Sequence, residues 1–242
     1  MAFFSKIIKS LLDHIPPMSF KCIVTNWDYM DSLCEKVVEG IREDGFEPQY
    51  IVALAKGGWF AGRIISDRLG LENLISMGIE HYAGITEKDV KVEALDRSLE
   101  DKNVLIVDDI ANTGESLKRA HEQIKSLNGV PRTAVLQLMY TSSFTPDYFG
   151  EYITEDAWMI FPWNFFEDMI DIVKKLMEKQ EGGWSEWDIK RALHKDYGID
   201  PIYLEITRPK KLFAVLREME WRGIVKGEIF EDEEMTWRLN NE

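Results

Sequence analysis

The stretch Val104-Leu105-Ile106-Val107-Asp108-Asp109-Ile110-Ala111-Asn112-Thr113-Gly114-Glu115-Ser116 decides the fold. Its four leading apolar residues, three of them β-branched, predict a strand that is buried on both faces. Two adjacent carboxylates follow at the expected end of this strand, before a short loop of small and hydroxyl residues. A helical pattern then runs from about residue 113 to residue 127 and ends at Asn128-Gly129. This order puts a helix N-terminus, which attracts phosphate, beside two acids that suit sugar hydroxyls or the water shell of Mg²⁺.

A second strand–turn–helix unit precedes this stretch. The residues Tyr50 to Ala55 predict a buried strand, Lys56-Gly57-Gly58 forms the turn, and a helix follows until Gly70. Glycine lets the backbone approach a ligand closely, and the lysine supplies a point charge for phosphate. We therefore expect a second anion-binding turn at the same sheet edge.

The remaining pattern between residues 28 and 153 predicts an α/β fold. A helix over residues 28–44, with Asp28 as its cap, has one apolar stripe made of Met30, Leu33, Cys34, Val37, Val38 and Ile41. Further strands are predicted at residues 74–82, 90–95, 133–140 and 149–153. Strands separated by helices imply a mostly parallel twisted sheet flanked by helices, with the binding loops at its carboxyl edge.

Three segments together resemble type I phosphoribosyltransferases. Residues 104–116 are similar to the motif that binds phosphoribosyl pyrophosphate (PRPP), and Lys56-Gly57 is similar to the pyrophosphate loop of that family, which often has Arg at this position. Residues 156–163 contain Trp158-Met-Ile-Phe-Pro-Trp163, which resembles the Trp-x-x-x-Pro-Trp segment of 6-oxopurine enzymes, in particular the xanthine–guanine type and its archaeal relatives. The resemblance extends over residues 20–163 and implies the type I phosphoribosyltransferase fold.

The resemblance also implies an activity and a role for each matching residue. The reaction would move the 5-phosphoribosyl group of PRPP to a purine-type nucleobase and release pyrophosphate, with Mg²⁺ as the cofactor. The 5′-phosphate would be bound by the loop made of Ala111, Asn112, Thr113, Gly114, Glu115 and Ser116. The pyrophosphate would be bound by Lys56 and Gly57. The ribose hydroxyls would be bound by Asp108 and Asp109, which would also bind Mg²⁺ through water. Lys56, Asp108, Asp109 and Asn112 are the candidate catalytic residues, and Trp158 and Met159 would bind the base by stacking and by a backbone contact. Tyr82, Ala83 and Gly84 would belong to a flap that excludes water, although Tyr82 is equally an ordinary strand aromatic.

Two positions depart from the 6-oxopurine pattern. Those enzymes have Asp before Thr-Gly, where this chain has Asn112, which can bond a base nitrogen but is no general base at neutral pH. They also have a Lys after the next strand, where this chain has Thr141 as the nearest match. Because adenine and orotate enzymes lack that Asp, the reaction class is kept while the identity of the base stays open.

The last third of the sequence differs in character. Helices are predicted over residues 167–179, from Ser185 with a capping box to Asp188, and from Thr207, where Pro209 falls in the first turn. Residues 223–230 and 235–239 alternate like a hairpin around an acidic turn, so residues 166–242 resemble a winged-helix domain behind a phosphoribosyltransferase domain at residues 18–165. Residues 1–17 predict an extension helix that ends at Pro16-Pro17, and Met18 is a candidate natural start.

Charge argues against nucleic acid as a partner. The whole chain has a net charge of −14, and residues 164–242 contain 13 Lys and Arg against 18 Asp and Glu. Lys210, Arg217 and Trp221 form a partly basic row on the third helix, which is equally a solvated face. We therefore expect an oligomerisation or packing module, and a homo-oligomer, before DNA recognition. The alternative is a PRPP-sensing regulator with little catalysis that uses the winged-helix-like domain for DNA or protein binding.

The compartment follows from what the sequence contains. No apolar run reaches transmembrane length, and no cleavage site follows the N-terminal segment, so we expect a cytoplasmic protein without membrane contact. Cys22 and Cys34 have no metal-binding spacing and no disulfide pattern. A buried structural thiol is expected at Cys34.

Overall fold

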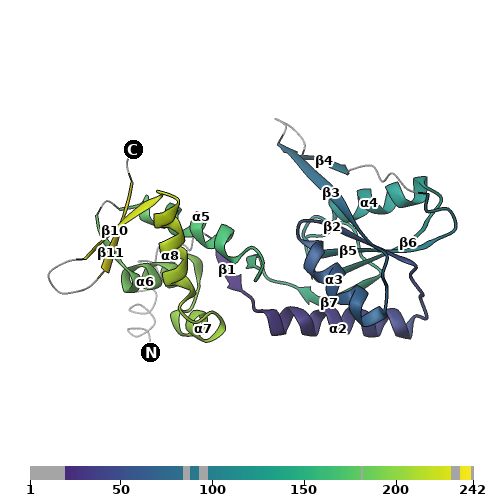
Figure 1. Ribbon diagram of the computed structural model, residues 1–242, viewed down its shortest axis with the longest axis horizontal. Coiled ribbons are helices and arrows are strands. Elements are labelled where there is room, and N and C mark those ends of the chain that lie inside the picture. Colours follow the sequence, from purple (N-terminus) through teal and green to yellow (C-terminus); the bar gives the residue numbers. More distant parts are fainter. Residues whose placement is uncertain (1–19, 84–87, 93–97, 181, 230–234, 241–242) are drawn as a thin grey trace, which may run out of the picture. The chain divides into compact units, whose positions relative to one another are not determined.

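The computed structural model describes residues 20–83, 88–92, 98–180, 182–229 and 235–240 (Figure 1). The chain divides into two compact units. The sheet unit is Trp27–Glu155, and the helical unit combines Met1–Asn26 with Asp156–Glu242. The chain therefore enters the helical unit, builds the whole sheet unit and then returns to the helical unit.

A six-stranded sheet forms the centre of the sheet unit, in the order β4-β3-β2-β5-β6-β7 (Figure 1). Its strands are β2 (Tyr50–Ala55), β3 (Leu74–Ala83), β4 (Lys88–Val92), β5 (Asn103–Ala111), β6 (Val130–Met139) and β7 (Tyr148–Ile153). All neighbours are parallel except β3 and β4, which form an antiparallel pair at one edge. The predicted α/β fold with a mostly parallel sheet is confirmed.

Three helices cover the two faces of this sheet (Figure 1). Helices α2 (Trp27–Glu43) and α3 (Gly58–Leu69) pack against each other on one face, and α4 (Glu115–Ser126) packs against β5 and β6 on the other. All six residues of the predicted α2 stripe are buried: Met30, Leu33, Cys34, Val37, Val38 and Ile41. The alternating pattern of β5 sends Val104 and Ile106 into the core under α4. Asp28 lies in the first turn of α2, so it is not the residue that precedes the helix.

The helical unit contains a parallel strand pair and a small antiparallel sheet. Strand β1 (Lys21–Val24) pairs with β8 (Ala157–Ile160), and β9 (Trp184–Ser185), β10 (Val225–Ile229) and β11 (Met235–Leu239) form a sheet in the order β10-β11-β9. The helices are α5 (Phe165–Met177), α6 (Glu186–Tyr197), α7 (Pro201–Thr207) and α8 (Lys211–Trp221). The predicted hairpin is confirmed, and β9 adds a strand that the sequence analysis missed.

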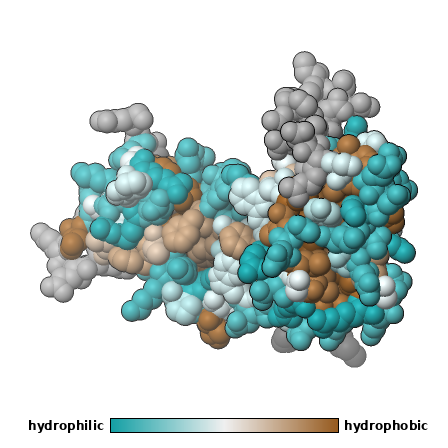
Figure 2. All heavy atoms as spheres, turned by 45° about the vertical axis from the view of Figure 1, so that its right-hand side comes forward, coloured by the Kyte–Doolittle hydropathy of each residue, from teal (hydrophilic) through white to brown (hydrophobic). Residues whose placement is uncertain are grey.

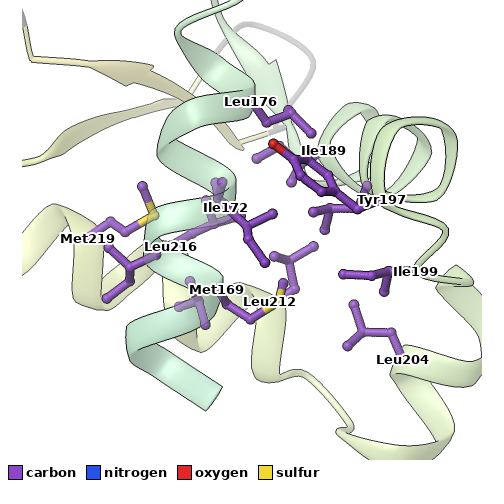
Figure 3. Packing of buried hydrophobic residues seen from close by; sticks show 14 of the residues in the cluster. Met169, Ile172, Leu176, Ile189, Tyr197, Ile199, Leu204, Leu212, Leu216 and Met219 are labelled. Carbon is purple, nitrogen blue, oxygen red and sulfur yellow. The ribbon is translucent and has the colours of Figure 1, made fainter. Parts of the chain in front are cut away.

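One hydrophobic core holds this unit together. Met169 and Ile172 of α5, Ile189 of α6 and Leu212 and Leu216 of α8 point toward one another (Figure 3). Cys22 and Val24 of β1 belong to the same core. The burial of apolar surface, which contributes about 25 cal/mol per Å², is the main force that stabilises the packing of these distant segments.

Helix starts in this unit follow the local sequence. Ser185 caps α6 through a capping box with Asp188, as predicted. The prediction that Thr207 caps the third helix is wrong, because Thr207 is the last residue of α7 and α8 begins at Lys211. Asp200 caps α7 and Pro201 is its first residue, a usual start sequence for a helix, and this helix was not predicted. The extension helix predicted for residues 1–17 lies outside the described residues.

Both cysteines are buried. Burial, with Asp168 as a further cause, raises the pKa of Cys22 to about 12, and burial also raises the pKa of Cys34 to about 12. A thiol in this state is a packing residue and not a nucleophile. Among the described residues, no helix is long and apolar enough to cross a bilayer.

Candidate active site

The two acids lie within β5 near its carboxyl end. β5 extends to Ala111, so the strand does not end before Asp108 as the sequence pattern predicted. Asp109 is 7% exposed and Asp108 is partly buried, and the backbone N–H of Asp109 donates to Asp108 Oδ1 over 3.0 Å. Burial and the neighbouring Asp109 raise the pKa of Asp108 well above its ordinary value. The fold therefore keeps two carboxyl groups adjacent at a cost to the ionised form of Asp108.

The Lys56-Gly57-Gly58 turn approaches these acids. A Cβ added to Gly57 would lie 2.4 Å from Asp109 Oδ2 and 2.5 Å from its Cγ, so the carboxyl group occupies the space beside this glycine. A Cβ added to Gly58 would lie 2.3 Å from the carbonyl oxygen of Val107. The Ala55–Lys56 peptide is cis, and Lys56 is exposed. The structure thus brings together two segments that are about fifty residues apart in the sequence.

The loop after β5 forms the start of α4. Ala111 is buried, Asn112 and Thr113 are exposed, and Gly114 precedes the helix with a left-handed φ of 78°. The backbone N–H of Glu115 is 3.4 Å from Thr113 Oγ1, while the Glu115 side chain pairs with Arg119 over 2.8 Å. Ser116 lies partly buried in the first helical turn. Unpaired backbone N–H groups and the helix dipole make such a turn suitable for a phosphate group.

A third loop, between β6 and β7, contacts the loop between β5 and α4. Ser143 donates to the carbonyl oxygen of Thr113 from both its N–H and its hydroxyl, each over 3.0 Å. Thr141 Oγ1 lies 2.9 Å from the carbonyl oxygen of Asn112 and 2.9 Å from its side-chain Oδ1. A Cβ added to Gly114 would lie 2.5 Å from Ser142 Oγ. Thr141 is the nearest match to the lysine of 6-oxopurine enzymes, but its contacts with Asn112 were not predicted; the run of three hydroxyl residues, Thr141 to Ser143, is the signal in the sequence.

The candidate base-binding residues belong to the helical unit. Trp158 and Met159 lie in β8, where Trp158 pairs in register with Cys22 of β1. Trp158 is exposed and its indole N–H donates to Asp168 over 3.1 Å, while Met159 is buried. Their roles toward a base stay predictions.

The candidate flap begins at the end of β3. Tyr82 pairs in register with Asp89 and Ala83 with Lys88, which places both residues in the antiparallel β3–β4 pair. Gly84 lies outside the described residues. The proposed role in excluding water stays a prediction.

The acids also fit the chemistry of a hard cation. Within the described ranges, no cluster of three or more His, Cys, Asp or Glu could enclose a metal ion. Two carboxylates suit Mg²⁺ when waters and substrate oxygens complete its shell, as is usual for this ion. A cation near Asp108 would favour the ionised form that burial disfavours. Asp108 and Asp109 would therefore hold Mg²⁺ only together with a substrate.

Comparisons with known proteins agree with this geometry. The model of the phosphoribosyl transferase domain family matches residues 24–138, which include the Lys56-Gly57-Gly58 turn and the loop between β5 and α4 but end before the loop between β6 and β7. A purine phosphoribosyltransferase from Pyrococcus horikoshii Ot3 is 29% identical, with a TM-score of 0.53 over 58% of this chain and 93% of its own. The xanthine-guanine-hypoxanthine phosphoribosyltransferase of Helicobacter pylori shares the fold at 16% identity, with a TM-score of 0.54 over 62% of this chain and 97% of its own. The family model therefore matches 115 of the 242 residues of this chain, and the chain has the type I phosphoribosyltransferase fold of these structures.

Proposed function

We propose that this protein transfers the 5-phosphoribosyl group of PRPP to a purine-type nucleobase, which yields a nucleoside monophosphate and pyrophosphate. The observation that supports it most directly is the contact between Gly57 and the Asp109 carboxyl group. Through this contact the Lys56-Gly57 turn, the two acids and the N-terminus of α4 lie at one edge of a mostly parallel sheet, where α/β proteins bind ligands. The purine phosphoribosyltransferase from Pyrococcus horikoshii Ot3 supports the purine class of acceptor.

Each part of the site would contribute to one part of the donor. The backbone N–H groups of residues 111–116, with the Thr113 and Ser116 hydroxyls, would bind the 5′-phosphate. Asp108 and Asp109 would accept hydrogen bonds from the ribose hydroxyls, and Lys56 with the Gly57 backbone would bind pyrophosphate. Mg²⁺, when bound with PRPP, would neutralise charge on the departing pyrophosphate.

The reaction requires positioning more than proton transfer. The bond from the ribose carbon to pyrophosphate weakens before the new bond to the base nitrogen is complete, so positive charge develops on the sugar. Groups that hold both substrates in line and shield that charge from water lower the barrier. Trp158 would stack on the base, and the segment at Tyr82, Ala83 and Gly84 would close over the substrates.

A direct assay tests this proposal. The full chain is incubated with PRPP, Mg²⁺ and a panel of adenine, hypoxanthine, guanine, xanthine and orotate, and nucleotide and pyrophosphate are measured together. Lys56→Met should lose activity, while the matched charge change Lys125→Met at the far end of α4 should retain it. Pyrophosphate release without nucleotide, or no release with any base, contradicts the proposal.

A PRPP-sensing regulator is the second candidate, because the helical unit has the element order of a winged helix. Helices α6 to α8 precede the β10–β11 hairpin, and β9 completes the sheet. Two ion pairs argue against DNA binding by the helical unit, because Arg217 pairs with Glu220 and Arg222 pairs with Glu218. PRPP binding without turnover, together with salt-sensitive retention of DNA, would support this candidate.

Exposed apolar residues favour protein contacts for the helical unit. Trp221 is 84% exposed, and Ile202 and Ile206 of α7 are 71% and 72% exposed. Figure 2 shows hydrophobic side chains among a mainly hydrophilic surface on the visible face. Exposed apolar groups of this size are typical of association surfaces. We propose a homo-oligomer, which light scattering of the intact chain would test.

A further inference from the structure

The oxygen and nitrogen atoms of the Asn112 side chain differ in their hydrogen bonding. Its Oδ1 lies 2.9 Å from Thr141 Oγ1, and Thr141 follows β6, the neighbour of β5 in the sheet. Among the hydrogen bonds of the described residues, none involves Asn112 Nδ2. Because the amide group is planar, holding its oxygen toward Thr141 directs its two N–H donors away from that residue.

The backbone beneath this side chain is also held. The Thr141 hydroxyl lies equally close to the carbonyl oxygen of Asn112, and Ser143 bonds the carbonyl oxygen of Thr113 twice. Two consecutive carbonyl groups of the loop between β5 and α4 therefore have hydrogen-bond partners in the β6–β7 loop. The position of the Asn112 backbone and the orientation of its amide depend on the same hydroxyl group.

We propose that Thr141 is a positioning residue that turns the Asn112 amide N–H groups toward the nucleobase, so that the site selects bases with a ring nitrogen acceptor beside the nitrogen that reacts. This inference rests on the proposed phosphoribosyl transfer. Asn112 follows Asp109 by three residues and precedes the loop proposed for the 5′-phosphate, so it lies beside the groups assigned to ribose. If Asp108 and Asp109 hold the ribose, a side chain at this place would lie near the part of the base that is closest to the sugar.

Purine chemistry restricts the acceptor to two atoms. In a purine that reacts at N9, the nearest other nitrogen atoms with a free lone pair are N3 and N7. Each of them can accept one hydrogen bond from an amide. An amide donates this bond without taking a proton, unlike a carboxylate at the same position. A site that donates to a substrate acceptor discriminates against an analogue that lacks this acceptor, because its own donor is then left unpaired.

The test uses deaza analogues in which C–H replaces one ring nitrogen. The purine that the wild type uses best is compared with its 3-deaza and 7-deaza analogues by kcat/KM. We expect the wild type to discriminate against one of the two analogues by roughly tenfold, the effect of one hydrogen bond of about 1.4 kcal/mol. Thr141→Ser keeps the hydroxyl and should keep the ratio, whereas Thr141→Val should lower it at least threefold. Asn112→Leu should abolish it.

A further variant separates a donor from an acceptor at this position. Asn112→Asp replaces the N–H donors with an ionised acceptor at pH 7, so kcat/KM for the preferred purine should fall. A rise in this variant, equal use of both analogues by the wild type, or an unchanged ratio in Thr141→Val overturns the inference. Turnover confined to pyrimidines also overturns it and leaves phosphoribosyl transfer intact. No turnover with any base in the combined nucleotide and pyrophosphate assay overturns both proposals, so the two failures are distinguishable.

Discussion

Replacing Gly57 with alanine tests the contact that joins the two halves of the site. Gly57 has φ −57° and ψ −47°, which any residue adopts, so the substitution adds no backbone strain. Its new Cβ would lie 2.4–2.5 Å from three atoms of the Asp109 carboxyl group. Restoring an ordinary contact of about 3.4 Å requires the carboxyl group or the turn to move by about 1 Å.

A displacement of this size has two measurable effects. A misplacement of about 1 Å in a catalytic arrangement costs about a hundredfold in rate, or about 2.7 kcal/mol of transition-state stabilisation. Overpacking of the site should lower the free energy of unfolding by about 1–3 kcal/mol. We expect both effects in Gly57→Ala, measured as kcat/KM for PRPP and by urea unfolding.

A double-mutant cycle shows whether the carboxyl group is the cause. Asp109→Ala removes all three atoms that the new Cβ would meet, so Gly57→Ala should destabilise the Asp109→Ala background by much less than the wild type. Gly40→Ala in α2 is the matched control, because its Cβ would meet only Tyr148 at 3.7 Å, and it should keep full activity. Full activity of Gly57→Ala, or additive stability effects in the cycle, refutes the reasoning.

Three further predictions concern charge and packing. Asp108→Asn should stabilise the substrate-free protein at pH 7, because a folded-state pKa raised above the unfolded-state value makes the carboxyl group destabilising once the pH rises above about 4. Its advantage in urea unfolding should vanish as the pH falls below about 4, and a variant that is less stable than the wild type at pH 7 contradicts this. Burial raises the pKa of Asp147, but hydrogen bonds from Arg132 and Thr133 outweigh this and lower it. Asp147→Ala should therefore lower the free energy of unfolding by about 1–3 kcal/mol at neutral pH. The loss should become smaller as the pH falls through that lowered pKa. An equal cost at pH 7 and pH 2 would contradict this. Trp237→Ala should lower the free energy of unfolding of the helical unit by about 3–5 kcal/mol, because the Trp237 side chain is 1% exposed. Trp221→Ala should change it by no more than about 0.5 kcal/mol, because Trp221 is 84% exposed. Thermal unfolding of both variants measures this difference.

Periodicity was sufficient to predict the elements that bury one face. The predicted stripe of α2 is buried, and the residues of α8 at the same helical spacing, Leu212, Val215, Leu216 and Met219, are buried too. Periodicity failed where the partner was distant or the element short. β9 has two residues and exists only because β11 pairs with it, and the seven-residue α7 is defined by its Asp-Pro start more than by any apolar repeat.

The site was predictable where a motif is continuous in the sequence. Residues 104–116 and Lys56-Gly57-Gly58 could be identified one at a time, and a parallel sheet places their ends together. The closeness of Gly57 to Asp109 could not be predicted, because it depends on how β2 and β5 are aligned. The bond between Thr141 and Asn112 joins residues 29 apart, and no local pattern encodes it.

The pairing of β1 with β8 determines the order in which the chain can fold during synthesis. The Thr25–Ile160 hydrogen bond next to this pair joins residues that are 135 positions apart. At 5–20 residues per second, the ribosome needs roughly 7–27 s to make the second partner after the first. The whole of Trp27–Glu155 is complete within that interval, long enough for a domain of this size to fold. Residues Lys21 to Val24 therefore remain without their strand partner on the nascent chain until residues 157–160 have been synthesised.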